Sequence, residues 1–142
     1  MQASVFDRMV ALFKSHGGYL CNSEEKARLK AVMWPDGAHL SKDVVGQHAS
    51  KIAKLAGIPG AESVKFLMVV GEAVGKEDMF SGEKLSPVLT LWNYNDFDDA
   101  IALVRDITRY SGYGHSCGIH TTNDEHMLRL ATNARVSRMM VR

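Results

Sequence analysis

The sequence predicts an α/β fold with a mostly parallel sheet and crossover helices, because helix-like and strand-like apolar patterns alternate along it. Short and almost wholly apolar runs at 66–70 and 87–92 are typical of buried strands, and the run at 87–92 is expected to be buried on both faces. Apolar residues at helical spacing occupy the stretches around these runs. Connections of this length between strands favour right-handed parallel crossovers.

Three helices are expected in the N-terminal half. Apolar residues recur at helical spacing between 5 and 13, and Gly17 ends that helix. Asn22 and Glu25 have the spacing of a capping box, which predicts the start of a second helix. A third helix is expected over 41–55, with a serine as its cap and the next glycine and proline as its stop signals.

The C-terminal half repeats the alternation. Asn95 is expected to cap a helix that ends near 111–112, with aspartates in its first turn. A strand is expected at 117–121, a helix opening at Asn123, and a last strand at 136–141. No internal repeat or linker interrupts the pattern, so residues 1–142 are interpreted as one domain.

Composition excludes several classes of protein. Of the 142 residues, 46% are hydrophobic and 23% charged, as in an ordinary soluble domain. The net charge is +1 with basic and acidic residues dispersed, so we expect no nucleic-acid partner. No apolar run approaches the ~20 residues of a membrane span, and the N-terminus has no signal-peptide pattern. Two cysteines are too few for a disulfide framework, which favours reduced thiols and a cytoplasmic location.

One carboxylate stands out in the segment 82–89. Glu83 lies just before a strand-like run, and Pro87 fixes the turn between them. Taken alone, Glu83 is a solvated turn carboxylate, the commonest state for this residue type. An ionised carboxylate can also accept two hydrogen bonds from a cis-diol, which is the chemistry of a sugar-binding group.

This segment resembles the aldehyde dehydrogenase superfamily. The stretches 71–94 and 112–122 are similar to its catalytic domain, and to the acylating, coenzyme A-dependent branch most closely. Residues 114–121 look like the Gly-His-Thr/Ser element of that branch. Weaker similarity extends over nearly the whole chain. The combination looks most like enzymes acting on small aldehydes, sulfoacetaldehyde among them.

The resemblance implies roles for three residues. Glu83 would hold the ribose hydroxyls of NAD or NADP, and Leu85 would pack near the nicotinamide, where many hydrolytic relatives have phenylalanine. His115 would be a pocket residue near the acyl or coenzyme A path. None of the three breaks a bond, so the resemblance assigns no catalytic residue to this chain.

The implied reaction oxidises a small aldehyde to its acyl-coenzyme A through a cysteine thioester, with NAD or NADP accepting the hydride. The nucleophilic cysteine and the dinucleotide-binding domain are expected outside residues 1–142. Since the chain also begins and ends abruptly around a helix and a strand, we interpret it as an internal fragment of a catalytic domain. It would be inactive alone and part of a homo-oligomer when full length.

The two cysteines and the histidines allow other interpretations. Cys21 and Cys117 lack a histidine or acid at a diagnostic spacing, which favours idle thiols over nucleophiles. His115, Cys117, His120 and His126 invite a metal site. On a strand, however, His120 would point away from the face of His115 and Cys117, so we expect no metal.

An alternative function remains open. The chain could be a stand-alone, non-catalytic α/β module that binds a nucleotide or another subunit. Arg135, Arg138 and Arg142 are sparse enough for a solvated face, and contact with a coenzyme A phosphate is a hypothesis. The sequence identifies neither the aldehyde nor the choice between NAD and NADP.

Overall fold

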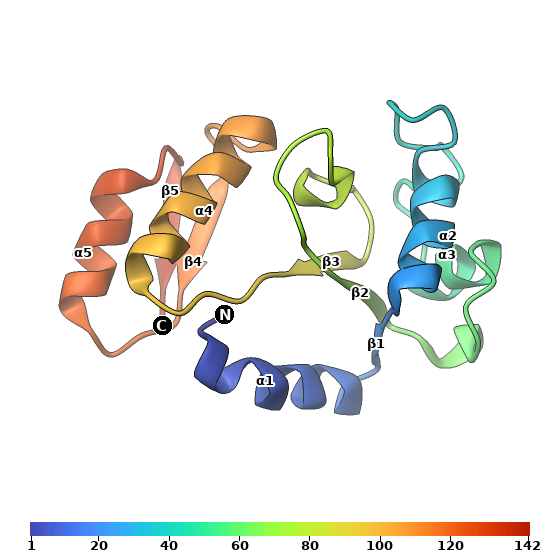
Figure 1. Cartoon of the computed structure of the whole chain (residues 1–142), viewed down its shortest axis with the longest axis horizontal. Coiled ribbons are helices and arrows are strands. Elements are labelled where there is room, and N and C mark those ends of the chain that lie inside the picture. The colour runs from blue at the N-terminus through green and yellow to red at the C-terminus, as the bar shows by residue number, and fades with distance from the viewer. The chain divides into compact units, whose positions relative to one another are not determined.

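The computed structural model describes the backbone of residues 1–142 and every side chain except that of Ala61. The chain forms two compact units, which are described separately (Figure 1). Unit 1 comprises Met1, Ala3–Glu72 and Lys84–Asn93, and unit 2 comprises Gln2, Ala73–Glu83 and Tyr94–Arg142. The elements of unit 1 are α1 (Ala3–Ser15), β1 (Gly18–Leu20), α2 (Ser23–Met33), α3 (Ala49–Leu55), a 3-10 helix (Ala61–Ser63), β2 (Phe66–Val70) and β3 (Val88–Leu91). Those of unit 2 are a 3-10 helix (Met79–Ser81), α4 (Phe97–Ser111), β4 (Ser116–Ile119), α5 (Asp124–Asn133) and β5 (Arg138–Val141).

Unit 1 is built on a three-stranded parallel sheet in the order β1-β2-β3. The central strand β2 is the apolar run expected from the sequence, and Leu67, Met68 and Val69 in it are fully buried. Leu67 pairs with Val88 of β3, which fixes the register. The predicted α/β class with parallel strands is confirmed.

The capping box of α2 is confirmed in both directions. The side-chain oxygen of Asn22 accepts from the backbone N–H of Glu25 at 2.9 Å, and the Glu25 carboxylate accepts from the N–H of Asn22 at 2.9 Å. Glu25 also accepts from the hydroxyl of Tyr19 at 2.7 Å. These two partners, the N–H of Asn22 and the hydroxyl of Tyr19, allow the Glu25 carboxylate to be buried at the start of the helix.

Three details of the sequence prediction are wrong. The third helix begins at Ala49 and not at 41, because Gly46 has a positive φ of 68° and donates its N–H to the carbonyl of Leu85. Asn95 is not a cap, since Asp96 occupies that position and makes no side-chain cap bond. Strand β1 was not predicted, because three residues are too few to show a period.

Strand β3 also departs from its prediction as a strand buried on both faces. Its ends, Val88 and Leu91, are buried, but Leu89 is 42% exposed. β3 is an edge strand of the sheet, and the residues that the structure describes leave the face of Leu89 open. An apolar run alone does not tell a strand buried on two faces from one buried on a single face.

Unit 2 contains the parallel pair β4–β5, with α4 and α5 running beside each other along it (Figure 1). Ser116 pairs with Arg138, which sets the register. Asn123 caps α5 as predicted, accepting from the N–H groups of Glu125 and His126. Within the described part of the chain, no helix combines the length and apolar character that crossing a bilayer requires.

Candidate functional site

The loop of unit 2 that leads to Glu83 is held by buried polar contacts. Asp78 is buried and accepts from the N–H of Phe80 at 3.2 Å, while Phe80 itself is fully buried. The Ser81 hydroxyl donates to the carbonyl of Asp78 at 2.7 Å and accepts from the N–H of Gly75 at 2.9 Å. These contacts fix the 3-10 turn just before Glu83, so the backbone that carries the carboxylate is well anchored.

Glu83 itself is fastened to the C-terminal end of α4. Its backbone N–H donates to the hydroxyl of Ser111 at 3.0 Å. Gly82 permits this approach, because a Cβ there would lie 3.1 Å from the ring of Tyr110. The Glu83 side chain remains 52% exposed, and its carboxylate is therefore held at the surface with lone pairs open to a ligand.

The structure brings His115 to Glu83, although 31 residues separate them in sequence. The His115 Nε2 atom lies 3.7 Å from the Glu83 Oε1 atom, and the imidazole is 66% exposed. Gly114, with a φ of 76°, turns the chain just before His115, and the His115 carbonyl accepts from both the N–H and the hydroxyl of Ser137. An exposed pair of this kind contributes at most ~1 kcal/mol to stability, so both groups are available for binding.

Leu85, the third residue assigned from the sequence, belongs to unit 1. Among the described residues, its φ of 44° is the only positive value at a non-glycine residue, and its carbonyl accepts from the N–H of Gly46 at 2.8 Å. Its side chain is 54% exposed. A left-handed conformation is unfavourable for a branched side chain and occurs often at functional sites. No pattern in the sequence predicts this conformation.

Neither cysteine has the character of a nucleophile. Burial raises the pKa of the Cys21 thiol to about 12, and the negative charge of Glu25 adds to the effect. Burial also raises the pKa of Cys117. A nucleophilic cysteine needs a lowered pKa, because the thiolate is the reactive form. Among the described residues, no group of three or more His, Cys, Asp or Glu could hold a metal ion.

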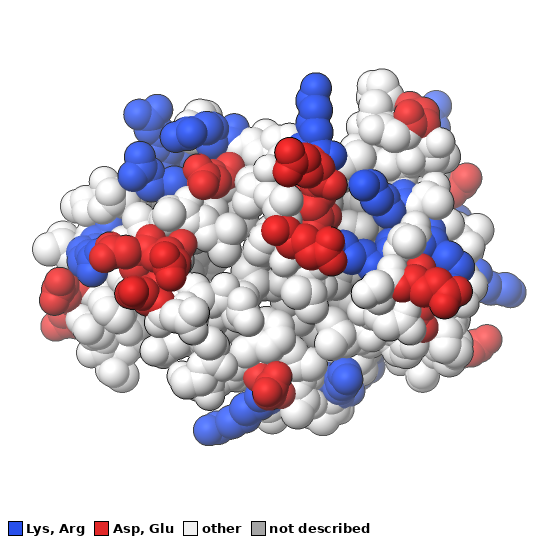
Figure 2. Space-filling model, in the orientation of Figure 1, with Lys and Arg blue, Asp and Glu red and all other residues white. Residues whose placement is uncertain are grey.

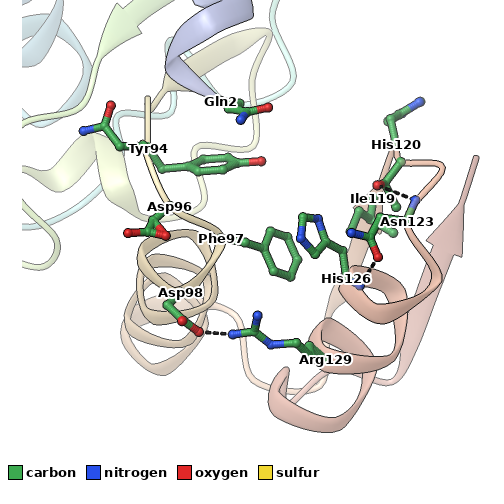
Figure 3. A pocket seen from close by; sticks show the side chains of 12 residues that line it. Gln2, Tyr94, Asp96, Phe97, Asp98, Ile119, His120, Asn123, His126 and Arg129 are labelled. Carbon is green, nitrogen blue, oxygen red and sulfur yellow. Dashed lines mark hydrogen bonds and ion pairs between the residues drawn. The ribbon is translucent and has the colours of Figure 1, made fainter.

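A cavity of unit 2 that the sequence did not predict lies beside α4 and α5 (Figure 3). It measures about 410 Å³. The rings of Phe97 and His126 stack in it with centroids 3.9 Å apart, and Arg129 lies over Phe97 and pairs with Asp98. Asp98 thus neutralises Arg129, while Asp96 contributes a second carboxylate to the lining of this cavity. Nothing in the sequence pairs Phe97 with His126.

The basic residues proposed for a phosphate contact are divided among different environments. The Arg138 guanidinium donates to the hydroxyl of Ser116 at 3.2 and 3.0 Å. The N–H of Arg142 donates to the carbonyl of Ile119, and its side chain is exposed. Arg135 lies over the ring of Tyr113 at 5.8 Å from the centroid. The structure therefore does not gather these three arginines around one ligand.

Comparison with known proteins finds relatives that share one name. The chain matches no family model. It is 41% identical over 140 residues to a sulfoacetaldehyde dehydrogenase (acylating) from Cupriavidus necator, covering 97% of this chain and 28% of that protein. It is 38% identical over 143 residues to the sulfoacetaldehyde dehydrogenase (acylating) of Bilophila wadsworthia, covering 98% of this chain and 31% of that protein.

The fold is shared with solved structures. A crystal structure of an acetylating aldehyde dehydrogenase from Geobacillus thermoglucosidasius superposes with a TM-score of 0.92 at 31% identity, covering 99% of this chain and 31% of that one. The chain thus spans about 30% of the length of these three relatives. Over nearly all of its residues, this chain is similar to a segment of these acylating and acetylating aldehyde dehydrogenases.

Proposed function

We propose that this chain is a segment of an NAD- or NADP-dependent acylating aldehyde dehydrogenase, which converts a small aldehyde to its acyl-coenzyme A. The observation that carries the proposal is the 41% identity over 140 residues to an enzyme named as an acylating sulfoacetaldehyde dehydrogenase. Sulfoacetaldehyde is accordingly the first substrate to test. The full-length protein would be a cytoplasmic homo-oligomer without nucleic-acid or membrane partners.

Glu83 is the residue to which we assign cofactor positioning. Its carboxylate is half-exposed, and its backbone is anchored to Ser111 and to the loop around Asp78. A fixed carboxylate with free lone pairs fits the two hydroxyls of a ribose, each of which can donate a charge-assisted hydrogen bond. When bound, the nicotinamide would supply the hydride acceptor. Leu85, held in a left-handed conformation, is proposed to pack near it.

His115 is proposed to line the path of the acyl group or coenzyme A. Its imidazole is exposed and lies 3.7 Å from Glu83, so it can reach a ligand that the carboxylate holds. We assign no bond-breaking role to any residue of this chain, because both thiols have raised pKa values. The nucleophilic cysteine and the dinucleotide-binding domain are proposed to lie in the remaining part of the enzyme.

A segment exchange tests the proposal. Residues 1–142 would replace the matching segment of the Cupriavidus necator relative, and the chimera would be assayed for reduction of NAD or NADP with sulfoacetaldehyde and coenzyme A. We expect turnover that requires coenzyme A, with the parent enzyme as the reference. A chimera that assembles like the parent, yet has no such turnover, would contradict the proposal and favour a non-catalytic module.

A further inference from the structure

Three arginines line one cavity of about 280 Å³ in unit 2. Arg105 and Arg109 are one helical turn apart on α4 and so share a face, while Arg135 follows α5. Figure 2 shows basic side chains gathered on the same unit, toward the end of α4. The cavity is completed by polar and aromatic residues: Thr108, Tyr113 and Asn133.

The positive charge of this cavity has little compensation. Arg109 has one acidic neighbour, Asp106, at 4.0 Å, and both side chains are largely exposed. Among the described residues, neither Arg105 nor Arg135 has a carboxylate within ion-pair distance. Three like charges around one cavity raise its electrostatic energy, and a bound anion would lower it.

Two of the neutral lining residues, Thr108 and Asn133, already donate within the protein. The Thr108 hydroxyl donates to the carbonyl of Val104 at 2.7 Å, and the Asn133 amide donates to the carbonyl of Arg129 at 2.8 Å. The charged donors left for a ligand are therefore those of the arginines, and the Tyr113 hydroxyl is the neutral donor beside them. Arg135 is further positioned by the Tyr113 ring beneath it, which reduces the entropy that binding must overcome.

We propose that the cavity of Arg105, Arg109 and Arg135 binds a phosphate group as its dianion. A guanidinium presents parallel N–H donors at the spacing of phosphate oxygens, and several of them match a double negative charge. The cavity is larger than a phosphate alone, which suits a phosphate monoester with part of its carrier. This binding does not depend on the proposed dehydrogenase function.

The test is a titration of the isolated 142-residue chain with inorganic phosphate, followed by NMR of the arginine Nε–H signals. Ionic strength is held constant with chloride. We expect the signals of Arg105, Arg109 and Arg135 to shift with saturation, and Arg105→Gln or Arg135→Gln to weaken binding about tenfold each. The control Arg8→Gln removes the same charge from exposed α1 in unit 1 and is expected to leave the affinity unchanged.

Further titrations identify the source of the phosphate. Coenzyme A is compared with dephospho-coenzyme A, and NADP with NAD, because each pair differs by one phosphate monoester. Tighter binding of one phosphorylated member supports the site and names its carrier, whereas equal binding within both pairs, with inorganic phosphate still bound, supports free phosphate. Shifts without saturation, or an equal loss in Arg8→Gln, would show general charge screening and overturn the proposal.

Discussion

The two units of this chain divide stability and candidate binding residues between them. Among the described residues, the buried hydrophobic side chains of unit 2 are Phe80, Ile101 and Leu130, while the many others lie in unit 1. Unit 2 carries the exposed pair Glu83–His115 and the arginine-lined cavity. Unit 1 thus contains a dense sheet core, whereas Glu83 and His115 of unit 2 are exposed, and hydrogen bonds anchor their backbone.

We therefore expect the stability and binding of the two units to respond to different kinds of substitution. In unit 1 the volume of each side chain matters, because fully buried residues have no room to relax. In unit 2 the anchoring hydrogen bonds matter, because they set the direction of exposed groups. Matched substitutions in the two units test whether this distinction holds.

The largest expected effect is in the centre of β2. Leu67→Ala removes a fully buried side chain and should lower the free energy of unfolding by about 2–5 kcal/mol. Leu128→Ala on α5 is the matched control, because Leu128 is 65% exposed, and its effect should stay within about 0.5 kcal/mol. Urea unfolding followed by circular dichroism measures both. Equal losses of unfolding free energy in Leu67→Ala and Leu128→Ala would contradict the distinction between the units.

The next largest effect on stability is expected from a comparison of two glycines, Gly71 and Gly118. A Cβ at Gly71 would lie 2.3 Å from the ring of Trp92, so Gly71→Ala forces the indole to move and should cost about 1–3 kcal/mol. At Gly118 the nearest atom is the Met140 carbonyl oxygen at 3.6 Å, an ordinary contact. Gly118→Ala should therefore be well tolerated. Thermal unfolding compares the two, and tryptophan fluorescence should change only for Gly71→Ala.

The two thiols should differ in reactivity by about tenfold or more. Cys21 has a pKa raised to about 12 by burial, whereas Cys117 is only partly buried. At pH 8 iodoacetamide should label Cys117 first, and labelling of Cys21 should become comparable in urea. Since the neutral thiol is the form that folding favours, the stabilisation from Cys21 is present below its unfolded pKa and is lost as pH rises toward 12. Faster labelling of Cys21 in the folded chain would contradict this account.

The smallest effect on stability is expected from substitutions at two helix starts. Asn123→Ala removes the side-chain oxygen that accepts two N–H groups at the start of α5, and should cost about 1 kcal/mol. Asn95 resembles a cap in sequence but lies before Asp96, the residue at the cap position of α4. Asn95→Ala should therefore have almost no effect. Chemical denaturation of both variants decides whether the structure or the sequence prediction is right.

The parts of the fold that could be predicted are those that local sequence patterns determine. The apolar run of β2 and the capping residues Asn22 and Asn123 were found because composition and spacing determine them. The start of α3 was missed, because it depends on a hydrogen bond from Gly46 to Leu85, far along the chain. The open face of Leu89 was missed because burial depends on neighbouring elements.

Prediction of the candidate site has the same limit, because contacts between distant segments are not visible in the sequence. Glu83 and His115 were identified separately through family resemblance, but only the fold shows that their side chains lie 3.7 Å apart. The cavity of Arg105, Arg109 and Arg135 has no signal in the sequence, because the last of these residues comes from a different segment. Sequence spacing places two of the arginines on one helix face, and tertiary structure adds the third.

The proposed role of Glu83 is tested most directly by cofactor kinetics in the segment-exchange chimera. Glu83→Gln should raise the KM for NAD or NADP about tenfold, since a neutral amide accepts weaker hydrogen bonds from the ribose, and should leave the KM for the aldehyde nearly unchanged. Glu77→Gln, an exposed carboxylate of the same loop, is the matched control and should change neither value. Unchanged cofactor KM in Glu83→Gln would contradict the assignment.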